Sequence, residues 1–206
     1  MSIVTQIEIQ QKNKERVNIY IDNQFFLGVN AEIVYDLKLK KGDEVDEDKL
    51  KSLIKRESLS KAKNKAMSIL NRTAISEKKL REKLSDFDEE IIDEVIFKLK
   101  DYGFINDKDL AKRIASDNSN ISRFGKNKIR QNLYRKGINK EDIDLVVNDL
   151  DYNTQYENAL YLAHKRYKNL KNEDSRVIYQ KLTQHLAYKG FDYDIIKSVI
   201  NEILSN

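Results

Sequence analysis

The feature that most constrains this fold is an internal repeat in the C-terminal part of the chain. Counted from Leu133 and from Leu186, a glycine follows four residues on, and apolar anchors follow ten, fourteen and seventeen residues on. The glycines are Gly137 and Gly190; the anchors are Ile143, Val147 and Leu150 in one copy and Ile196, Ile200 and Ile203 in the other. Repetition at this period is typical of structural units that stack on their neighbours.

A third and weaker copy lies upstream, where the interval between the first and last anchors is shorter and the glycine is missing. Its anchors are Leu80, Leu84, Ile92, Val95, Ile96 and Leu99. An apolar helical segment precedes each copy, so we predict three helices per unit. Ser76, Asn106 and Asn139 are predicted N-caps because their side chains can accept from the first turn of a helix. The acidic runs Asp88-Glu89-Glu90 and Glu141-Asp142 suit the first turns of helices.

These patterns predict a mainly helical fold of three tandem three-helix repeats, at residues 58–108, 109–152 and 153–206. Each repeat alone buries little apolar surface, so we expect the repeats to share interfaces in an elongated, curved array. Such a shape presents a long surface to another extended object and offers little room for a deep catalytic pocket.

Residues 1–57 have a different pattern and are predicted to form a small strand-rich domain. Apolar residues alternate with period two through Ile3, Ile7, Ile9, Val17, Ile19, Ile21, Phe25 and Leu27. Asp22-Asn23 suits a tight hairpin turn, since both residue types tolerate positive φ. A helix should follow from Asn30 to Leu39 and end at Lys41-Gly42, with the glycine in the left-handed conformation. A new helix should begin after Asp46.

Composition excludes most catalytic chemistries. The chain has no cysteine and only two histidines, His164 and His185, so it has no thiolate nucleophile and no metal cluster of the usual Cys/His type. No phosphate-binding loop, dinucleotide glycine pattern or nucleophile elbow occurs. We therefore expect a non-enzymatic protein without cofactor or metal. Proline is absent, which favours uninterrupted helices. No segment has the composition of a membrane span or signal peptide, and we expect a cytoplasmic protein.

The clearest candidate for a binding surface is an acid-free stretch at residues 118–140. It contains Arg123, Lys126, Lys128, Arg130, Arg135, Lys136 and Lys140. A second acid-free stretch, residues 158–172, contains Lys165, Arg166, Lys168 and Lys171. Residues 123–126 read as a helix entry, and a helix N-terminus beside cations attracts phosphate or carboxylate. The partner could be nucleic acid or an acidic groove on a protein. A solvated face is the alternative.

Tyrosines accompany these cations, at Tyr134, Tyr152, Tyr156, Tyr161 and Tyr167. Base stacking is one use of such residues. At helical spacing a tyrosine more often lies in the core or at its boundary with its hydroxyl in water, and we interpret these five in that way. Both histidines are interpreted as surface or boundary residues.

At the repeat anchors the chain resembles the RecX family. The segment from Gly125 to Ile138, GKNKIRQNLYRKGI, looks like that family's central motif, and residues 102–107, YGFIND, look like the linker before it. Residues 7–28 are similar to the strand-rich extension of RecX proteins from Gram-positive bacteria. The resemblance covers essentially the whole chain, and the first unit departs most because it lacks the Lys-Gly step.

The resemblance implies a regulator of the recombinase RecA in recombinational DNA repair and the SOS response. It further implies that the chain lies in the groove of the RecA–DNA filament, where it would hinder filament growth, strand exchange and repressor cleavage. The cations of the two acid-free stretches are the candidate contacts to RecA and, more weakly and in a salt-dependent way, to single- and double-stranded DNA. The competing hypothesis is a stand-alone DNA-binding protein, and a recruiting scaffold is a weaker third. A monomer is expected.

Overall fold

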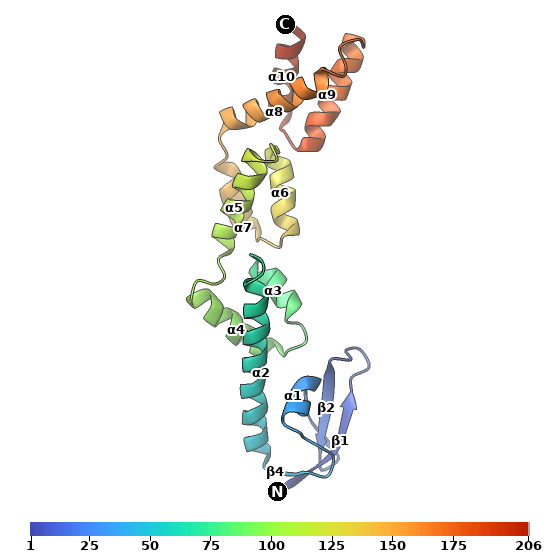
Figure 1. Cartoon of the computed structure of the whole chain (residues 1–206), viewed down its shortest axis with the longest axis vertical. Helices are drawn as coiled ribbons and strands as arrows, with labels where there is room; N and C mark the ends of the chain where they lie inside the picture. The colour runs from blue at the N-terminus through green and yellow to red at the C-terminus, as the bar shows by residue number, and fades with distance from the viewer. Residues whose placement is uncertain (206) are drawn as a thin grey trace. The chain divides into compact units, whose positions relative to one another are not determined.

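The computed structural model describes residues 1–205, and it divides into two compact units, residues 1–105 and residues 106–205 (Figure 1). A small antiparallel sheet opens the first unit, and helices make up most of the rest of both units. The predicted fold class, a strand-rich start followed by three-helix repeats, is confirmed.

The sheet has the strand order β3-β2-β1-β4 and is antiparallel throughout. Its strands are β1 (Ser2–Ile9), β2 (Arg16–Ile21), β3 (Gln24–Asn30) and β4 (Glu44–Val45). Asp22 and Asn23 have φ values of 48° and 65°, which is the positive-φ hairpin turn that their residue types predict. The short strand β4 was not predicted, because two residues carry no readable alternation.

Helix α1 (Ala31–Asp36) is shorter than its sequence pattern indicated. The prediction that Gly42 closes it is wrong. Lys38 takes the left-handed conformation after the helix, with φ 54°, and Gly42, with φ 95°, lies in the later turn that leads to β4. A non-glycine residue therefore occupies the position where glycine is usual.

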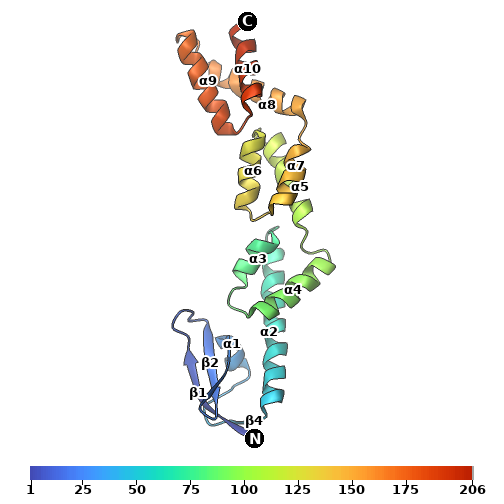
Figure 2. The ribbon, with the colours of Figure 1, turned by 180° about the vertical axis from the view of Figure 1, so that it is seen from behind.

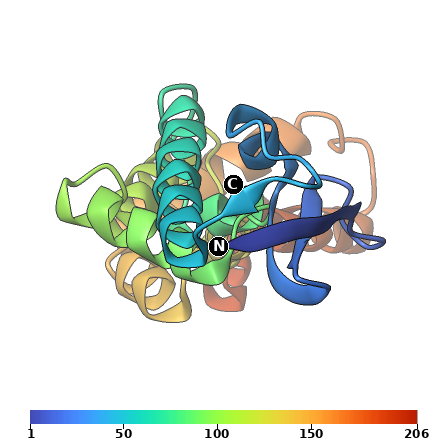
Figure 3. The same cartoon turned by 90° about the horizontal axis from the view of Figure 1, so that it is seen from below.

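Helix α2 (Glu47–Leu70) takes part in two apolar cores. Leu50 and Ile54 pack with the sheet and α1, whereas Ala62 and Ala66 pack with α3 and α4. Figure 3, seen from below, shows α2 running beside α1 and the strands. The chain is helical through residues 57 and 58, so the strand-rich domain and the first repeat share one continuous element.

A buried aspartate fastens the sheet to the first repeat. Asp86, 6% exposed, lies in the loop between α3 and α4. Its carboxylate accepts from Lys65 Nζ at 2.6 Å and from Asn30 Nδ2 at 3.1 Å, while its carbonyl accepts from Arg16 at 2.9 Å. Arg16 also pairs with Asp88. A buried carboxylate with several donors is held far more firmly than a surface ion pair.

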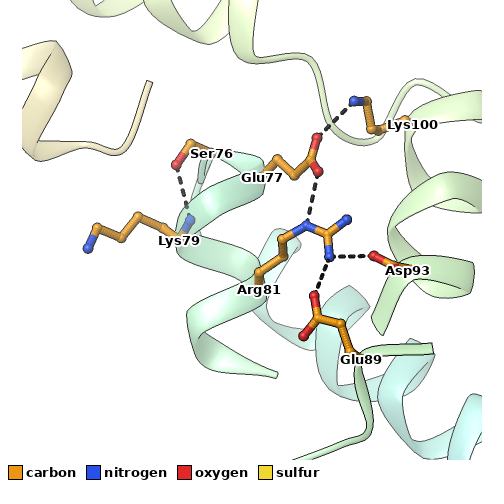
Figure 4. A network of polar contacts seen from close by, with 7 residues as sticks. All are labelled: Ser76, Glu77, Lys79, Arg81, Glu89, Asp93 and Lys100. Carbon is orange, nitrogen blue, oxygen red and sulfur yellow. Dashed lines mark hydrogen bonds and ion pairs between the residues drawn. The ribbon is translucent and has the colours of Figure 1, made fainter. Parts of the chain in front are cut away.

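The first repeat is completed by α3 (Glu77–Lys83) and α4 (Glu89–Asp101), which a polar network joins (Figure 4). Arg81 donates to Glu77 at 3.0 Å and to Asp93 at 2.7 Å. Lys100 from the end of α4 donates to Glu77 at 2.8 Å. The anchors Leu80, Leu84, Ile92, Val95, Ile96 and Leu99 are all buried in one core, as the weak third copy predicted.

The second unit contains two further three-helix repeats, each with its own apolar core. The second repeat consists of α5 (Asp107–Asn120), α6 (Lys126–Arg135) and α7 (Lys140–Asn148). The third consists of α8 (Tyr152–Tyr167), α9 (Ser175–Lys189) and α10 (Tyr193–Ser205). The predicted N-caps Ser76, Asn106 and Asn139 are confirmed. Within residues 1–205, no helix is both long and apolar enough to span a membrane.

We predict that Glu77→Gln destabilises the first repeat more at neutral pH than in acid. Partial burial opposes ionisation of Glu77, yet hydrogen bonds from Lys100 and Arg81 outweigh it and lower the pKa of the carboxyl. Its stabilising effect is therefore fully present above the pKa of an unfolded glutamate, about 4.3, and is lost as pH falls through the lower folded value.

Hydrogen exchange of residues 77–101 at pH 7 and pH 3 measures this effect. The opening free energy should fall by up to about 1 kcal/mol in the variant at pH 7. At pH 3 the difference between wild type and variant should be smaller than at pH 7. Equal protection at both pH values would contradict the role given to this carboxylate.

Candidate functional site

The cations of the first acid-free stretch divide into two groups by exposure. Arg135, Lys136 and Lys140 are exposed, at the end of α6, in the following turn and at the start of α7. Arg123, Lys126, Lys128 and Arg130 are half-buried. The candidates of the second stretch, Lys165, Arg166 and Lys168, are exposed at the C-terminal end of α8.

The half-buried cations lie near a junction between the second and third repeats, and this junction is built on backbone contacts. The N–H of Gly125 donates to the carbonyl of Lys189 at 2.9 Å, and the N–H of Asn127 donates to the carbonyl of Gly190 at 2.9 Å. Figure 2 shows the C-terminal end of α9 next to the N-terminal end of α6. The negative end of one helix dipole thus meets the positive end of another.

The approach is so close that both backbones must be glycine at the point of contact. A Cβ on Gly125 would lie 2.3 Å from the carbonyl carbon and oxygen of Gly190. A Cβ on Gly190 would lie 2.3 Å from the nitrogen of Lys128, and Gly190 also needs its φ of 90°. Carbonyls of the third repeat thus take the N–H donors of Gly125 and Asn127, and these two donors are not free to bind phosphate.

Three cations lie over aromatic rings across this junction. The guanidinium of Arg123 lies 4.0 Å from the ring centroid of Tyr161, and Lys128 Nζ lies 5.1 Å from that of Tyr188. In the opposite direction, Lys189 of the third repeat lies 5.4 Å from the ring of Phe124. Such contacts contribute about 0.5–1 kcal/mol each at exposed sites and more when desolvated. Arg123 and Lys128 therefore stabilise the junction.

A polar layer continues the junction beneath Arg123. Asn158, 6% exposed, donates to the carbonyl of Ser119 at 2.9 Å and accepts from Arg123 at 3.3 Å. One turn earlier, the amide of buried Gln155 makes no hydrogen bond within residues 1–205. A buried amide without partners costs about 1–3 kcal/mol. The Asn158 contacts add to the backbone hydrogen bonds of the junction, whereas the Gln155 amide adds none.

The remaining cations have weak or local partners. Arg130 lies 3.5 Å from Asp144, and both side chains are about two-fifths exposed, so the pair is worth little. Arg135 donates to Asn132 on its own helix. Tyr134, 72% exposed, lies among them on α6. Solvated cations around an exposed ring can bind a polyanion, and they provide no group for bond making or breaking.

The two histidines agree with their interpretation as surface and boundary residues. His164 is exposed and His185 is half-buried. Burial, together with the charges of Lys189 and Arg166, lowers the pKa of His185.

Sequence reasoning missed the partners of the junction: Lys189, Tyr188, Asn158 and Phe124. The signal that could have found the first of them is the repeated Lys-Gly step, which marks α9 as well as α6. The sequence did not show that the glycine of one repeat would pack on the helix entry of the repeat before it.

Comparison with known proteins matches three parts of the chain to RecX domain families. Residues 2–46 match the regulatory protein RecX N-terminal domain, residues 106–147 the second three-helix domain and residues 153–200 the third. The regulatory protein RecX of Clostridioides difficile is 53% identical over 206 residues, which cover 100% of this chain and 97% of that protein. The chain belongs to the RecX family.

Other RecX family members agree with this assignment. The regulatory protein RecX of Clostridium botulinum strain Alaska E43 is 37% identical over 209 residues, covering 100% of this chain and 98% of that protein. A crystal structure of a regulatory protein RecX is similar over 98% of this chain and 100% of its own, with a TM-score of 0.69 and 28% identity. RecX from Lactobacillus salivarius covers 73% of this chain and 99% of its own, at 31% identity and a TM-score of 0.70.

We predict that Gly125→Ala separates the second and third repeats without unfolding either core. The methyl group cannot be accommodated without moving the backbone of Gly190, so the two backbone hydrogen bonds should break. The second unit should lose about 2–3 kcal/mol of stability, as overpacking and unmade bonds together imply. Hydrogen exchange should quicken at residues 123–128 and 186–191.

The matched control is Gly103→Ala. A Cβ there meets nothing within 4 Å, and the substitution costs only the strain of a φ of 73°. If the amides of residues 123–128 and 186–191 exchange in Gly125→Ala at the wild-type rate, the backbone contacts assigned to the junction are contradicted.

Proposed function

We propose that this RecX family member binds the RecA–DNA filament and restrains filament growth, ATPase activity and strand exchange. Family membership supports a regulatory role, and the family resemblance points to RecA. The observation that carries the proposal is that exposed cations on two adjoining repeats, at Arg135, Lys136, Lys140, Lys165, Arg166 and Lys168, lie in stretches of the chain without acids.

The junction between the repeats holds these two groups of cations on one structural unit. Because backbone hydrogen bonds hold α9 against α6, cations from both repeats are carried on one compact unit. Preorganised charges lose less conformational entropy on binding than charges on a flexible chain. Contacts from two repeats to an extended partner would also add, as linked binding modules do.

We place this activity in the cytoplasm, with the chain acting as a monomer and without catalysis of its own. The side chains at the surface in question are lysine, arginine, tyrosine and asparagine, which bind and orient but hold no nucleophile with an adjacent base. Inhibition would therefore follow from occupancy of the filament.

The second candidate is a stand-alone DNA-binding protein. Exposed Tyr134, among Arg130 and Arg135 on α6, favours it, since an aromatic ring between cations is a common platform for single-stranded nucleic acid. The two candidates differ in their dependence on RecA. A phosphate-contacting protein binds DNA alone with a steep dependence on salt, whereas a filament modulator acts at a small fraction of the RecA concentration.

We predict that the triple variant Arg135→Glu, Lys140→Glu, Lys165→Glu loses its effect on RecA while its repeats stay folded. All three side chains are exposed and make no contact across the junction, so reversal should act on binding alone. The measurement is RecA ATPase activity and filament length on single-stranded DNA, with the chain at a small fraction of the RecA concentration. Wild type should lower both, and the variant should need at least about tenfold more protein.

The control carries the same change of net charge in the first unit: Lys12→Glu, Lys14→Glu, Lys63→Glu. It should inhibit like wild type. Inhibition by the triple variant equal to that of wild type would exclude these cations as the binding surface. An unchanged filament with wild type, together with salt-dependent binding to DNA alone, would favour the second candidate. Lack of any effect on RecA or DNA would favour a scaffold that recruits other proteins.

A further inference from the structure

The turn after α1 holds a lysine in a backbone conformation that usually belongs to glycine. The N–H of Lys38 donates to the carbonyl of Tyr35 at 3.0 Å, and that of Leu39 donates to Val34 at 3.1 Å. These are the two bonds of a Schellman motif, in which the residue after the C-cap is left-handed. Lys38 occupies that position with φ 54°.

Elsewhere the chain uses glycine for this purpose. After α4, α6 and α9 the corresponding residues are Gly103, Gly137 and Gly190, all with positive φ. A side chain in the left-handed region strains the backbone, and such strain is often found at functional positions. Arg123, with φ 53°, is a second cationic residue in the left-handed region, and its guanidinium lies over the ring of Tyr161. Lys38 forms no ion pair or hydrogen bond with its side chain within residues 1–205, so the fold does not use its charge.

Beside Lys38 lies a shallow apolar hollow of about 390 Å³. The Schellman motif forms it, because the motif brings Val34 and Leu39 together at the end of α1. Ala31, Tyr35, Lys38 and Lys40 complete the lining. The ring of Tyr35 also lines the hollow, and this side chain is 82% exposed.

The charges around the hollow are positive and uncompensated. Lys38, Lys40 and Lys41 form no ion pair among the described residues. The carboxylates nearby have other partners: Glu32 and Asp36 both pair with Lys61, at 2.9 and 2.8 Å. Asp43 accepts from the backbone N–H of Lys40. The rim is therefore electrostatically complementary to a carboxylate-rich partner.

We propose that this hollow binds an acidic, extended protein segment that carries one aromatic or large aliphatic anchor. The anchor would contact Val34, Leu39 and the ring of Tyr35, while carboxylates of the segment pair with Lys38 and Lys40. A nucleic acid fits less well because the floor of the hollow is apolar. The site lies in the first unit, apart from the basic stretches of the second, and thus adds a contact beyond the proposed function.

The test uses the full chain and a synthetic peptide of eight glutamates around a central phenylalanine. Amide shifts in the ¹⁵N spectrum should change on titration in residues 31–41. Lys38→Gly should weaken peptide binding by about tenfold, which is the loss of one ion pair and its orientation. Its melting temperature should be equal to or above that of wild type, since glycine relieves the strain; a merely structural lysine would not separate these two results.

Tyr35→Ala should also weaken binding of this peptide, whereas Lys63→Gln, at an exposed lysine of α2, should leave the affinity unchanged. If the amide chemical shifts of residues 31–41 do not change, or if Lys38→Gly binds the peptide as tightly as wild type, the proposal is overturned. Equal chemical-shift changes with a poly-thymidine oligonucleotide would show a general polyanion site instead. The assay contains neither RecA nor DNA filament, and the triple variant Arg135→Glu, Lys140→Glu, Lys165→Glu should bind the peptide normally, so its failure is distinct from failure of the proposed function.

Discussion

The second unit depends on one interaction, the backbone contact between the end of α9 and the start of α6. Two hydrogen bonds form there, and the negative end of one helix dipole meets the positive end of another; only glycine at 125 and 190 lets the backbones approach. Each repeat closes its own apolar core, and hydrogen bonds and cation–ring contacts join the two repeats. These contacts are directional, and they fix one arrangement of the two repeats where apolar packing alone would allow several.

This junction divides the basic residues by role. Arg123, Lys128 and Lys189 lie over aromatic rings of the opposite repeat, where their positive charges stabilise the junction. Arg135, Lys140 and Lys165 remain in solvent. A run of cations in a sequence is thus not one surface. The same helix entry that looked like an anion site is occupied by the carbonyls of its neighbour, and the surface available to a partner begins further along α6.

Features that depend on local chemistry could be predicted from the sequence. The repeat anchors, the N-caps Ser76, Asn106 and Asn139, and the Asp22-Asn23 turn each follow from residues close together in the chain. Features that depend on distant partners could not. Nothing near Arg123 indicates Tyr161, and nothing in α2 indicates that its two halves serve different cores. The end of α1 was also predicted wrongly. The usual preference for glycine at a helix end indicated Gly42, but Lys38 has the left-handed conformation that ends the helix.

The central proposal is that the exposed cations around the end of α6 contact the RecA–DNA filament. Its most direct test replaces Tyr134, 72% exposed on that helix, with photoreactive benzoylphenylalanine and irradiates the protein with RecA filaments on single-stranded DNA. The same group at Phe25, 61% exposed on β3, is the comparison. Our account predicts a covalent adduct with RecA from position 134 at several-fold higher yield than from position 25. Adducts with DNA alone, or equal yields from both positions, would contradict it.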